Sequence, residues 1–228
     1  MTKKIFVISL GGSLIVPGQI DVKFLKDFRA FIISQIKAGG RFIISPGGGK
    51  TCRNYQAALK NSAYPSANDL DLIGLYTNNY HAKLLRLIFK GFSEATVADD
   101  PNKKFPFNKP ILIGSGGWKP GRSSDDFSVR LAKIYKADTI INLSNIDFVY
   151  DKDPKKFKSA QKITKISWRD FLAMIGSKWI PGKNVPFDPT AAKFAQKYKQ
   201  KVIIANGKDF KNLKNILDGK SFRGTTIF

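Results

Sequence analysis

Short apolar runs alternate along this chain with longer segments in which apolar side chains recur at helical spacing. Residues 4–10 form the first apolar run, which ends at Gly11-Gly12. Beyond it, Phe24, Phe28, and then positions 32 and 36, place one apolar residue in every four, as on one face of a helix. The pattern predicts strands at residues 4–10, 41–45, 110–114, 139–143, 201–205 and 224–228. It predicts helices at residues 21–38, 50–60, 70–89, 127–136, 189–199 and 209–217.

The alternation of strands and helices predicts an α/β fold, a three-layer sandwich around a largely parallel central sheet. Residues 61–68 are small and polar and are expected to form a loop, and the lysine-rich segment 151–165 is expected to form turns. No linker or internal repeat divides the chain, so we expect a single domain over residues 1–228. In such sheets ligands bind beyond the carboxyl ends of the strands.

The composition is that of a packed globular protein. Of the 228 residues 43% are hydrophobic, and 18 are phenylalanine, which excludes a disordered chain. The only cysteine, Cys52, cannot form an intrachain disulfide, which fits a reducing compartment. The first apolar run is too short for a secretion signal, and no stretch reaches the roughly 20 apolar residues of a membrane span. We therefore expect a cytoplasmic protein without a membrane partner.

The chain is strongly basic, with 39 lysines and arginines against 17 acidic residues and a formal net charge of +22. A surface of this charge attracts phosphorylated metabolites and nucleic acid alike. No helix-turn-helix, zinc-finger or RNA-recognition signature is present in the sequence, so nucleic acid is the secondary candidate partner. The charge is explained equally well if most lysines are solvated surface residues that bind no partner.

Two glycine clusters carry the candidate chemistry. Gly11-Gly12 and Gly47-Gly48-Gly49 each follow an apolar run and precede a predicted helix. Glycine lets backbone N–H groups approach an anion, and a helix N-terminus favours negative charge. Either cluster alone is often only a tight turn, but two at one sheet edge predict a site for two phosphates. Gly48 is expected to need a positive φ angle or to leave space beside those phosphates.

Neither cluster has the spacing of a common nucleotide-binding motif. Gly49, Lys50 and Thr51 match the end of a Walker A loop, but Ile44 stands where that motif requires its first glycine. Likewise, Cys52 stands where the dinucleotide-binding motif G-x-G-x-x-G requires its last glycine.

A third cluster, residues 114–125, is long, polar and rich in glycine. It ends in Asp125, which either caps the following helix or serves the site.

These clusters, in this order, resemble the uridylate kinase family, especially its archaeal-type branch. Residues 144–154 read SNIDFVYDKDP and are similar to the family's T-N-V-D-G-V-Y-x-x-D-P, the most specific part of the likeness. The likeness extends from about Lys4 to the tail at residues 224–227. It implies the amino-acid-kinase fold and transfer of the γ-phosphoryl group of ATP to UMP, which gives UDP.

The resemblance implies an ATP side of the site. The turn after the first strand would lie against the transferring phosphate, and the segment 144–153 would hold the ATP nucleoside. The implied ATP-binding residues are Ser9, Leu10, Gly11, Gly12, Gly49, Arg53, Ser144, Tyr150 and Asp153.

The resemblance also implies a UMP side. Gly48 would face UMP, Asp71 would contact its ribose, and residues 118–124 would wrap its base and phosphate. The implied UMP-binding residues are Gly48, Asp71, Trp118, Lys119, Pro120, Gly121, Arg122, Ser123 and Ser124.

Phosphoryl transfer needs two aligned phosphates, a divalent cation and cations on the equatorial oxygens. The candidate catalytic residues are Lys183, Asp125 and Asp147. Lys183 follows a Pro-Gly turn, where relatives with other substrates place a transition-state lysine, although many lysines of so basic a chain are simply solvated. The two aspartates lie close to the loops and would organise lysines or magnesium.

Magnesium is the expected cofactor, bound together with ATP as co-substrate. One histidine and one cysteine cannot form a zinc site, so we expect no protein metal site, and Mg²⁺ would be held mostly by phosphates and water. The resemblance further implies a homo-oligomer, a hexamer built from dimers.

Several positions depart from the family pattern. Ser9 stands where the bacterial branch has a lysine, and Phe148 replaces the glycine of D-G-V-Y. Asn78, Asn79 and His81 fall where relatives often carry Thr, Arg and Asn.

Two alternative functions therefore stay open. One is a kinase of the same fold that acts on isopentenyl phosphate, carbamate or a carboxylate. For isopentenyl phosphate, the histidine usual in the second glycine loop is missing from residues 47–50. The other is a nucleotide-binding or nucleic-acid-binding protein without turnover.

Overall fold

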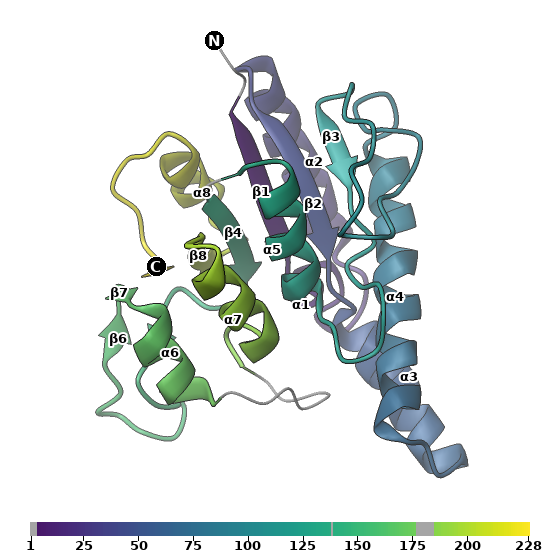
Figure 1. Ribbon diagram of the computed structural model, residues 1–228, viewed down its shortest axis with the longest axis vertical. Coiled ribbons are helices and arrows are strands. Elements are labelled where there is room, and N and C mark those ends of the chain that lie inside the picture. Colours follow the sequence, from purple (N-terminus) through teal and green to yellow (C-terminus); the bar gives the residue numbers. More distant parts are fainter. Residues whose placement is uncertain (1–3, 138, 177–184) are drawn as a thin grey trace.

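The computed structural model describes residues 4–137, 139–176 and 185–228, and a seven-stranded sheet forms its centre (Figure 1). In spatial order its strands are β3 (Ile111–Ile113), β2 (Arg41–Pro46), β1 (Ile5–Leu10), β4 (Thr139–Ser144), β8 (Lys201–Asn206), β9 (Thr225–Ile227) and β7 (Lys165–Ile166). Neighbours from β3 to β8 are parallel, β9 is antiparallel to β8, and β7 is parallel to β9. The predicted α/β fold with a largely parallel sheet is confirmed.

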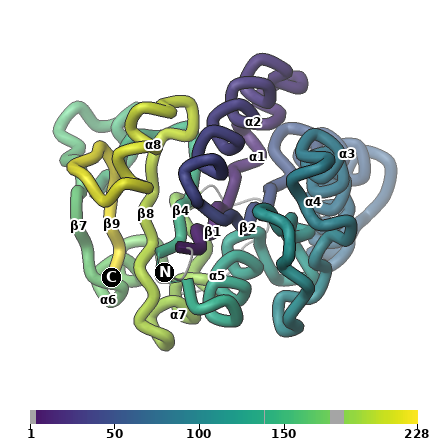
Figure 2. Tube along the Cα trace, turned by 90° about the horizontal axis from the view of Figure 1, so that it is seen from above, coloured from purple at the N-terminus to yellow at the C-terminus, as the bar shows by residue number. Residues whose placement is uncertain are grey.

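Helices cover both faces of this sheet, with α2 and α8 on one side and α5, α6 and α7 on the other (Figure 2). The described helices are α1 (Gly12–Ile15), α2 (Val22–Lys37), α3 (Gly49–Ser62), α4 (Ala67–Ile88), α5 (Ser124–Ile134), α6 (Trp168–Ile175), α7 (Pro189–Lys197) and α8 (Phe210–Leu217). The six helices predicted from apolar spacing are all present. The periodicity did not reveal α1 and α6. The four residues of α1 are too few for a helical period to stand out, whereas α6 was missed although it has the same length as α8, which the spacing did locate.

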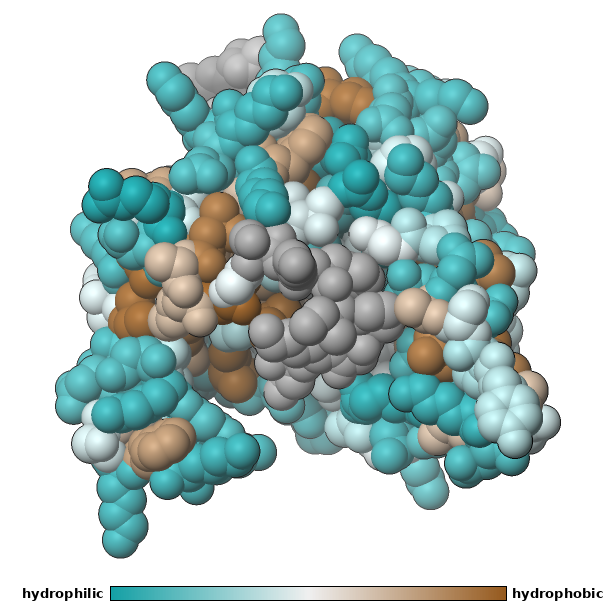
Figure 3. Space-filling model, turned by 60° about the horizontal axis from the view of Figure 1, so that its bottom comes forward, coloured by the Kyte–Doolittle hydropathy of each residue, from teal (hydrophilic) through white to brown (hydrophobic). Residues whose placement is uncertain are grey.

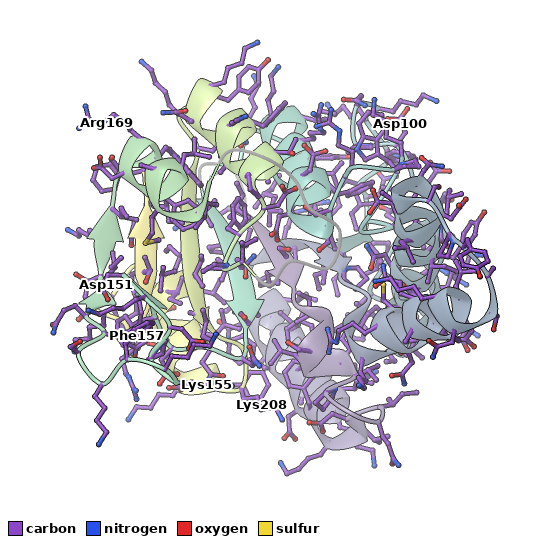
Figure 4. All side chains as sticks on the ribbon, turned by 90° about the horizontal axis from the view of Figure 1, so that it is seen from below. Asp100, Asp151, Lys155, Phe157, Arg169 and Lys208 are labelled. Atoms are coloured by element: carbon purple, nitrogen blue, oxygen red, sulfur yellow. The ribbon has the colours of Figure 1, made fainter. Side chains whose placement is uncertain are left out.

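A separate pair of short antiparallel strands, β5 (Val149–Tyr150) and β6 (Lys162–Ile163), flanks the lysine-rich segment. The turns predicted for residues 151–165 are therefore present up to β6, and the segment ends in strands. Asp151, Lys155 and Phe157 of this segment lie together at one edge of the molecule, on the far side from Asp100 (Figure 4).

The sheet separates two apolar cores because alternate residues of each strand face opposite sides. On β1, Phe6, Ile8 and Leu10 pack into the core that contains Phe28 of α2. Val7 packs into the other core, together with Phe127 of α5. The cores thus hold β1 from both sides, which fixes the position of the turn that follows it.

The strands β1, β2 and β4 end side by side. Leu10 pairs with Pro46 of β2 and with Leu143 of β4, so the turns after these strands meet at one edge of the sheet, at the lower end in Figure 1. The predicted meeting of the first two glycine clusters at one edge is confirmed.

Hydrophilic side chains cover most of the face seen in Figure 3, as the basic composition predicts. No helix in the described part of the chain is long and apolar enough to cross a membrane.

Phe28 tests the first core. Its ring is fully buried, stacks on Phe24 and meets Phe89 edge-on, so Phe28→Ala should lower the free energy of unfolding by about 3–5 kcal/mol. Urea denaturation measures the loss, and Phe157→Ala, at a phenylalanine 51% exposed, should cost less than about 1 kcal/mol. Equal losses in both variants would contradict this packing.

Candidate functional site

The turns after β1 and β2 contact each other through their backbones. A Cβ on Gly12 would lie 2.1 Å from the nitrogen of Gly49, and a Cβ on Gly49 would lie 2.2 Å from the oxygen of Gly12. Gly49 also has a φ angle of +59°, which L-residues with a side chain rarely adopt. The contact between the two loops therefore requires glycine at both positions.

Gly48 differs from its expected role. Its φ angle is −80°, so the left-handed conformation belongs to Gly49. A Cβ on Gly48 would lie 2.6 Å from Cβ of Cys52 and 2.7 Å from Oγ1 of Thr77. A larger residue at Gly48 would therefore disturb the packing of α3 on α4 as well as any bound phosphate.

Buried polar side chains of α4 hold two of the glycine clusters. Nδ1 of His81 lies 2.8 Å from the oxygen of Gly47, and Nδ2 of Asn78 donates to the oxygen of Gly116 at 2.6 Å. Because a carbonyl oxygen can only accept, Nδ1 of His81 carries the proton. Burial lowers the pKa of His81, so the ring stays neutral. Asn78 and His81, two of the departures from the family pattern, thus fasten the loops.

A cavity of about 570 Å³ opens beside the two loops. One wall is a face of α3, and another is the face of α4 that carries positions 71, 74, 75 and 78 at helical spacing. The lining residues are Gly12, Ser13, Gly47, Gly48, Gly49, Cys52, Arg53, Gln56, Asp71, Gly74, Leu75, Asn78, Arg122, Ser123, Ser124, Ser144 and Asn145.

The helices that begin at the glycine loops are uncapped. Of the eight described helices, only α1 and α3 lack a side chain that accepts a hydrogen bond from their first turn. Neither has an acidic residue in that turn. In these first turns the N–H groups of Leu14 and Lys50 donate to the backbone oxygens of Gly11 and Val16. No side chain neutralises the positive local field at either N-terminus, which suits an anion.

Asp125 lies at the carboxyl ends of the strands and links three elements. Its Oδ1 accepts from Oγ of Ser9 and from Nδ2 of Asn142, both at 2.8 Å, and its Oδ2 accepts from the nitrogen of Asp188 at 3.2 Å. The N-cap of α5 is Ser123, so Asp125 does not cap the helix. Burial, followed by the Asp188 carboxylate, raises the pKa of Asp125 from 3.8 to about 7.

The structure brings about half of the predicted site residues to this cavity. Those that line it are Gly12, Gly48, Gly49, Arg53, Asp71, Arg122, Ser123, Ser124 and Ser144. Gly121 does not line the cavity but contacts a residue that does, because its N–H donates to Oδ2 of Asp71 at 2.7 Å. Ser9, Leu10 and Gly11 form the buried end of β1 and its turn, under the loops.

Other predicted residues lie away from the lining. Tyr150 belongs to β5, and Asp153 accepts a hydrogen bond within the lysine-rich segment. Asp147 accepts from Nδ2 of Asn206 and Nη2 of Arg223, both at 2.9 Å. Within the described part of the chain it shares no hydrogen-bond partner with Asp125. Lys183 lies outside the described residues.

Several lining residues were not predicted for the site, among them Gln56, Gly74 and Leu75. The available signal was a break in the apolar stripe of α4, where Asp71, Gly74 and Asn78 share one face at helical spacing.

A larger cavity, of about 1260 Å³, lies at the opposite, amino end of the strands. It is lined by residues such as Lys4, Arg41, Phe107 and Tyr135 and by no glycine loop. Two of these side chains stabilise the segment before β3, since Arg41 donates to the oxygen of Lys109 at 3.0 Å and Tyr135 to that of Phe105 at 2.7 Å. We therefore assign the functional site to the smaller cavity.

Comparisons with known proteins agree with this geometry. Residues 4–206 match the model of the amino acid kinase family. The uridylate kinase of Thermoplasma volcanium is 36% identical over 225 residues, covering 97% of this chain and 96% of the relative. That of Thermococcus sibiricus is 32% identical over 227 residues, covering 97% and 98%. The crystal structure of uridylate kinase from Archaeoglobus fulgidus superposes with a TM-score of 0.81 at 28% identity, covering 98% of this chain and 99% of that one.

The raised pKa of Asp125 predicts a pH-dependent stability. Between its ordinary value of 3.8 and about 7 the folded protein binds more protons at this carboxyl than the unfolded chain, so the contribution of Asp125 to stability falls as pH rises. Asp125→Asn cannot titrate, so its free energy of unfolding relative to that of the wild type should rise by about 1–3 kcal/mol between pH 4 and pH 8. Urea denaturation across this range measures the difference, and a difference independent of pH would contradict the shift.

The contact between the loops predicts different outcomes at two glycines with positive φ. Gly49→Ala should meet both strain and the backbone of Gly12, whereas Gly39, with a φ of +92°, has nothing within 4 Å of an added Cβ. Strain alone should cost Gly39→Ala about 1–3 kcal/mol of stability without affecting ligands. Gly49→Ala should also lose nucleotide binding, measured by calorimetry, and normal binding in that variant would show that the loops need not touch.

Proposed function

The chain belongs to the amino acid kinase family, and we propose that it is an ATP-dependent UMP kinase that forms UDP. Archaeal relatives named uridylate kinase match it over nearly its whole length. In the structure, the observation that carries the proposal is the pair of uncapped helices, α1 and α3, that begin at touching glycine loops beside one cavity. Such an arrangement suits two phosphates brought close together.

The two nucleotides approach from different sides of this contact. ATP lies toward Gly12, Gly49, Arg53 and the end of β4, and its nucleoside extends toward β5. UMP lies toward α4, with Asp71 at its ribose, and toward the loop 118–124. This arrangement rests on the cavity lining and on the family likeness of these segments.

Catalysis in this proposal is positioning and charge stabilisation. Repulsion between two anionic phosphates is the main barrier to their approach, and fixed N–H donors and guanidinium groups offset it without reorganisation. Of the described residues that line the cavity, Arg53 and Arg122 are the cations. Lys183 is a further candidate for stabilising the transition state.

Magnesium would enter with ATP. The ion would be held mostly by the phosphates of ATP, by water and by at most one or two carboxylates. The described residues contain no group of three or more His, Cys, Asp or Glu side chains that could hold a metal. Bound there, Mg²⁺ would neutralise phosphate charge. Asp125 would hold Ser9 and Asn142 beneath the transferring group.

The proposal extends to the rest of the chain. One catalytic domain would span residues 1–228, in keeping with relatives that match 97% of this chain. It would work in the cytoplasm as a homo-oligomer, as the family likeness implies.

A coupled assay of ADP production tests the proposal. With ATP and Mg²⁺, we expect turnover with UMP and the appearance of UDP, and at least tenfold lower kcat/KM with CMP, dUMP, acetylglutamate, carbamate or isopentenyl phosphate. Chromatography of the products identifies UDP directly. Turnover with another acceptor but not with UMP would refute the substrate, and binding of ATP without any turnover would favour a nucleotide-binding protein.

A further inference from the structure

Three helices of this protein begin with the same signature, a serine N-cap followed three residues later by aspartate. They are α4 with Ser66 and Asp69, α5 with Ser123 and Asp126, and α6 with Ser167 and Asp170. In a capping box the acidic side chain at this third position bonds back to the N-cap residue.

The aspartates of α4 and α6 do so. Asp69 Oδ2 accepts from the nitrogen and Oγ of Ser66 at 2.8 and 2.7 Å, and Asp170 Oδ2 accepts from Oγ of Ser167 at 2.6 Å. Both aspartates are exposed, and their carboxylates serve the helix alone.

Asp126 of α5 is used differently. Ser123 still caps the helix by accepting from the nitrogen of Asp126 at 3.2 Å, but its hydroxyl donates to Asp188. The carboxylate of Asp126 is fully buried and turns away from the cap. It accepts from Nε1 of Trp118 at 3.2 Å and Nε of Arg130 at 2.9 Å, and it lies 3.5 Å from Nη1 of Arg122.

Two of these three donors belong to the loop 118–124 at the proposed acceptor side, and Arg122 lines the cavity. The third, Arg130, supports the same loop from beneath, since its guanidinium lies 5.4 Å from the ring of Trp118 and 4.6 Å from that of Phe194. The carboxylate therefore joins both ends of the loop to α5.

We propose that Asp126 is a positioning residue for the phosphate-bearing acceptor, which keeps Trp118 and Arg122 in place so that Arg122 faces the cavity. Releasing the loop would leave a buried carboxylate with fewer partners, which is costly. A guanidinium has five N–H donors, and the structure assigns one of those of Arg122 to Asp126, which leaves others for a phosphate. The inference rests on the proposed function in taking UMP as the acceptor.

Steady-state kinetics of Asp126→Asn test the proposal. Loss of a charge-assisted bond should raise KM for UMP about tenfold, with kcat and KM for ATP changed less than about threefold. The matched control is Asp170→Asn, the same substitution at the same position of α6, which should leave all three constants unchanged. An unchanged KM for UMP in folded Asp126→Asn would overturn the proposal, as would an equal rise of both Michaelis constants.

A second pair of variants covers the case in which Asp126→Asn does not fold. Trp118→Phe keeps an aromatic ring but loses the N–H donor, and Arg122→Gln removes the cation. Each should weaken UMP binding, and the double variant should lose less than the product of the two factors, because both act through one carboxylate. Independent, multiplicative losses would contradict a shared anchor.

Calorimetry with UMP alone separates this proposal from the proposed function. If the wild type binds UMP but forms no UDP, the kinase assignment fails while the weakened binding in the variants still supports the role of Asp126. A wild type that binds no UMP overturns both.

Discussion

The backbone contact between Gly12 and Gly49 is the constraint on which the site depends. A side chain at either position would meet the other loop within about 2 Å, so the turns after β1 and β2 can approach only as bare backbone. That approach places the N-termini of α1 and α3 side by side, both without side-chain caps. The sheet maintains the contact because β1 and β2 pair in register up to Leu10 and Pro46, and apolar cores pack on both sides of β1.

Buried polar groups then fasten the surrounding loops to this centre. His81 and Asn78 of α4 hold the second and third glycine clusters, Asp125 joins α5 to β1 and β4, and Asp126 anchors the loop before α5. One of these groups, Asp125, contributes less to stability once it ionises. The raised pKa of Asp125 shows that its ionised form is disfavoured in the fold, a common cost at sites arranged for charged ligands.

The sequence was most informative where the physics is local. Apolar spacing located β1 and α2 because a strand or helix of a two-sided sheet repeats one burial pattern over many residues, and the glycines after β1 and β2 marked the site because backbone contact admits no side chain. Local patterns could not show that Asn78 reaches Gly116, 38 positions away, or that the positive φ falls on Gly49 rather than Gly48. Nor could they distinguish Asp126 from Asp69 and Asp170, because all three follow a serine N-cap by three residues. Only Asp126 binds Trp118 and Arg130 in place of its own cap, because α5 packs beneath the 118–124 loop. The family likeness predicted site roles for Tyr150, Asp153 and Asp147, but none of the three lines the cavity.

The account requires both nucleotides to bind at once, with their phosphates meeting at the glycine loops. The most direct measurement is calorimetry with a compound in which uridine and adenosine are joined by a polyphosphate chain that spans both halves of the site. We predict that one molecule of the compound binds per chain, at least a hundredfold more tightly than UMP or ADP alone. Joining the ligands avoids the entropy cost of binding the second one from solution. Either nucleotide should compete with the compound. Affinity no greater than that of the better single nucleotide, or competition by only one of them, would contradict a shared site at the contact of the two loops.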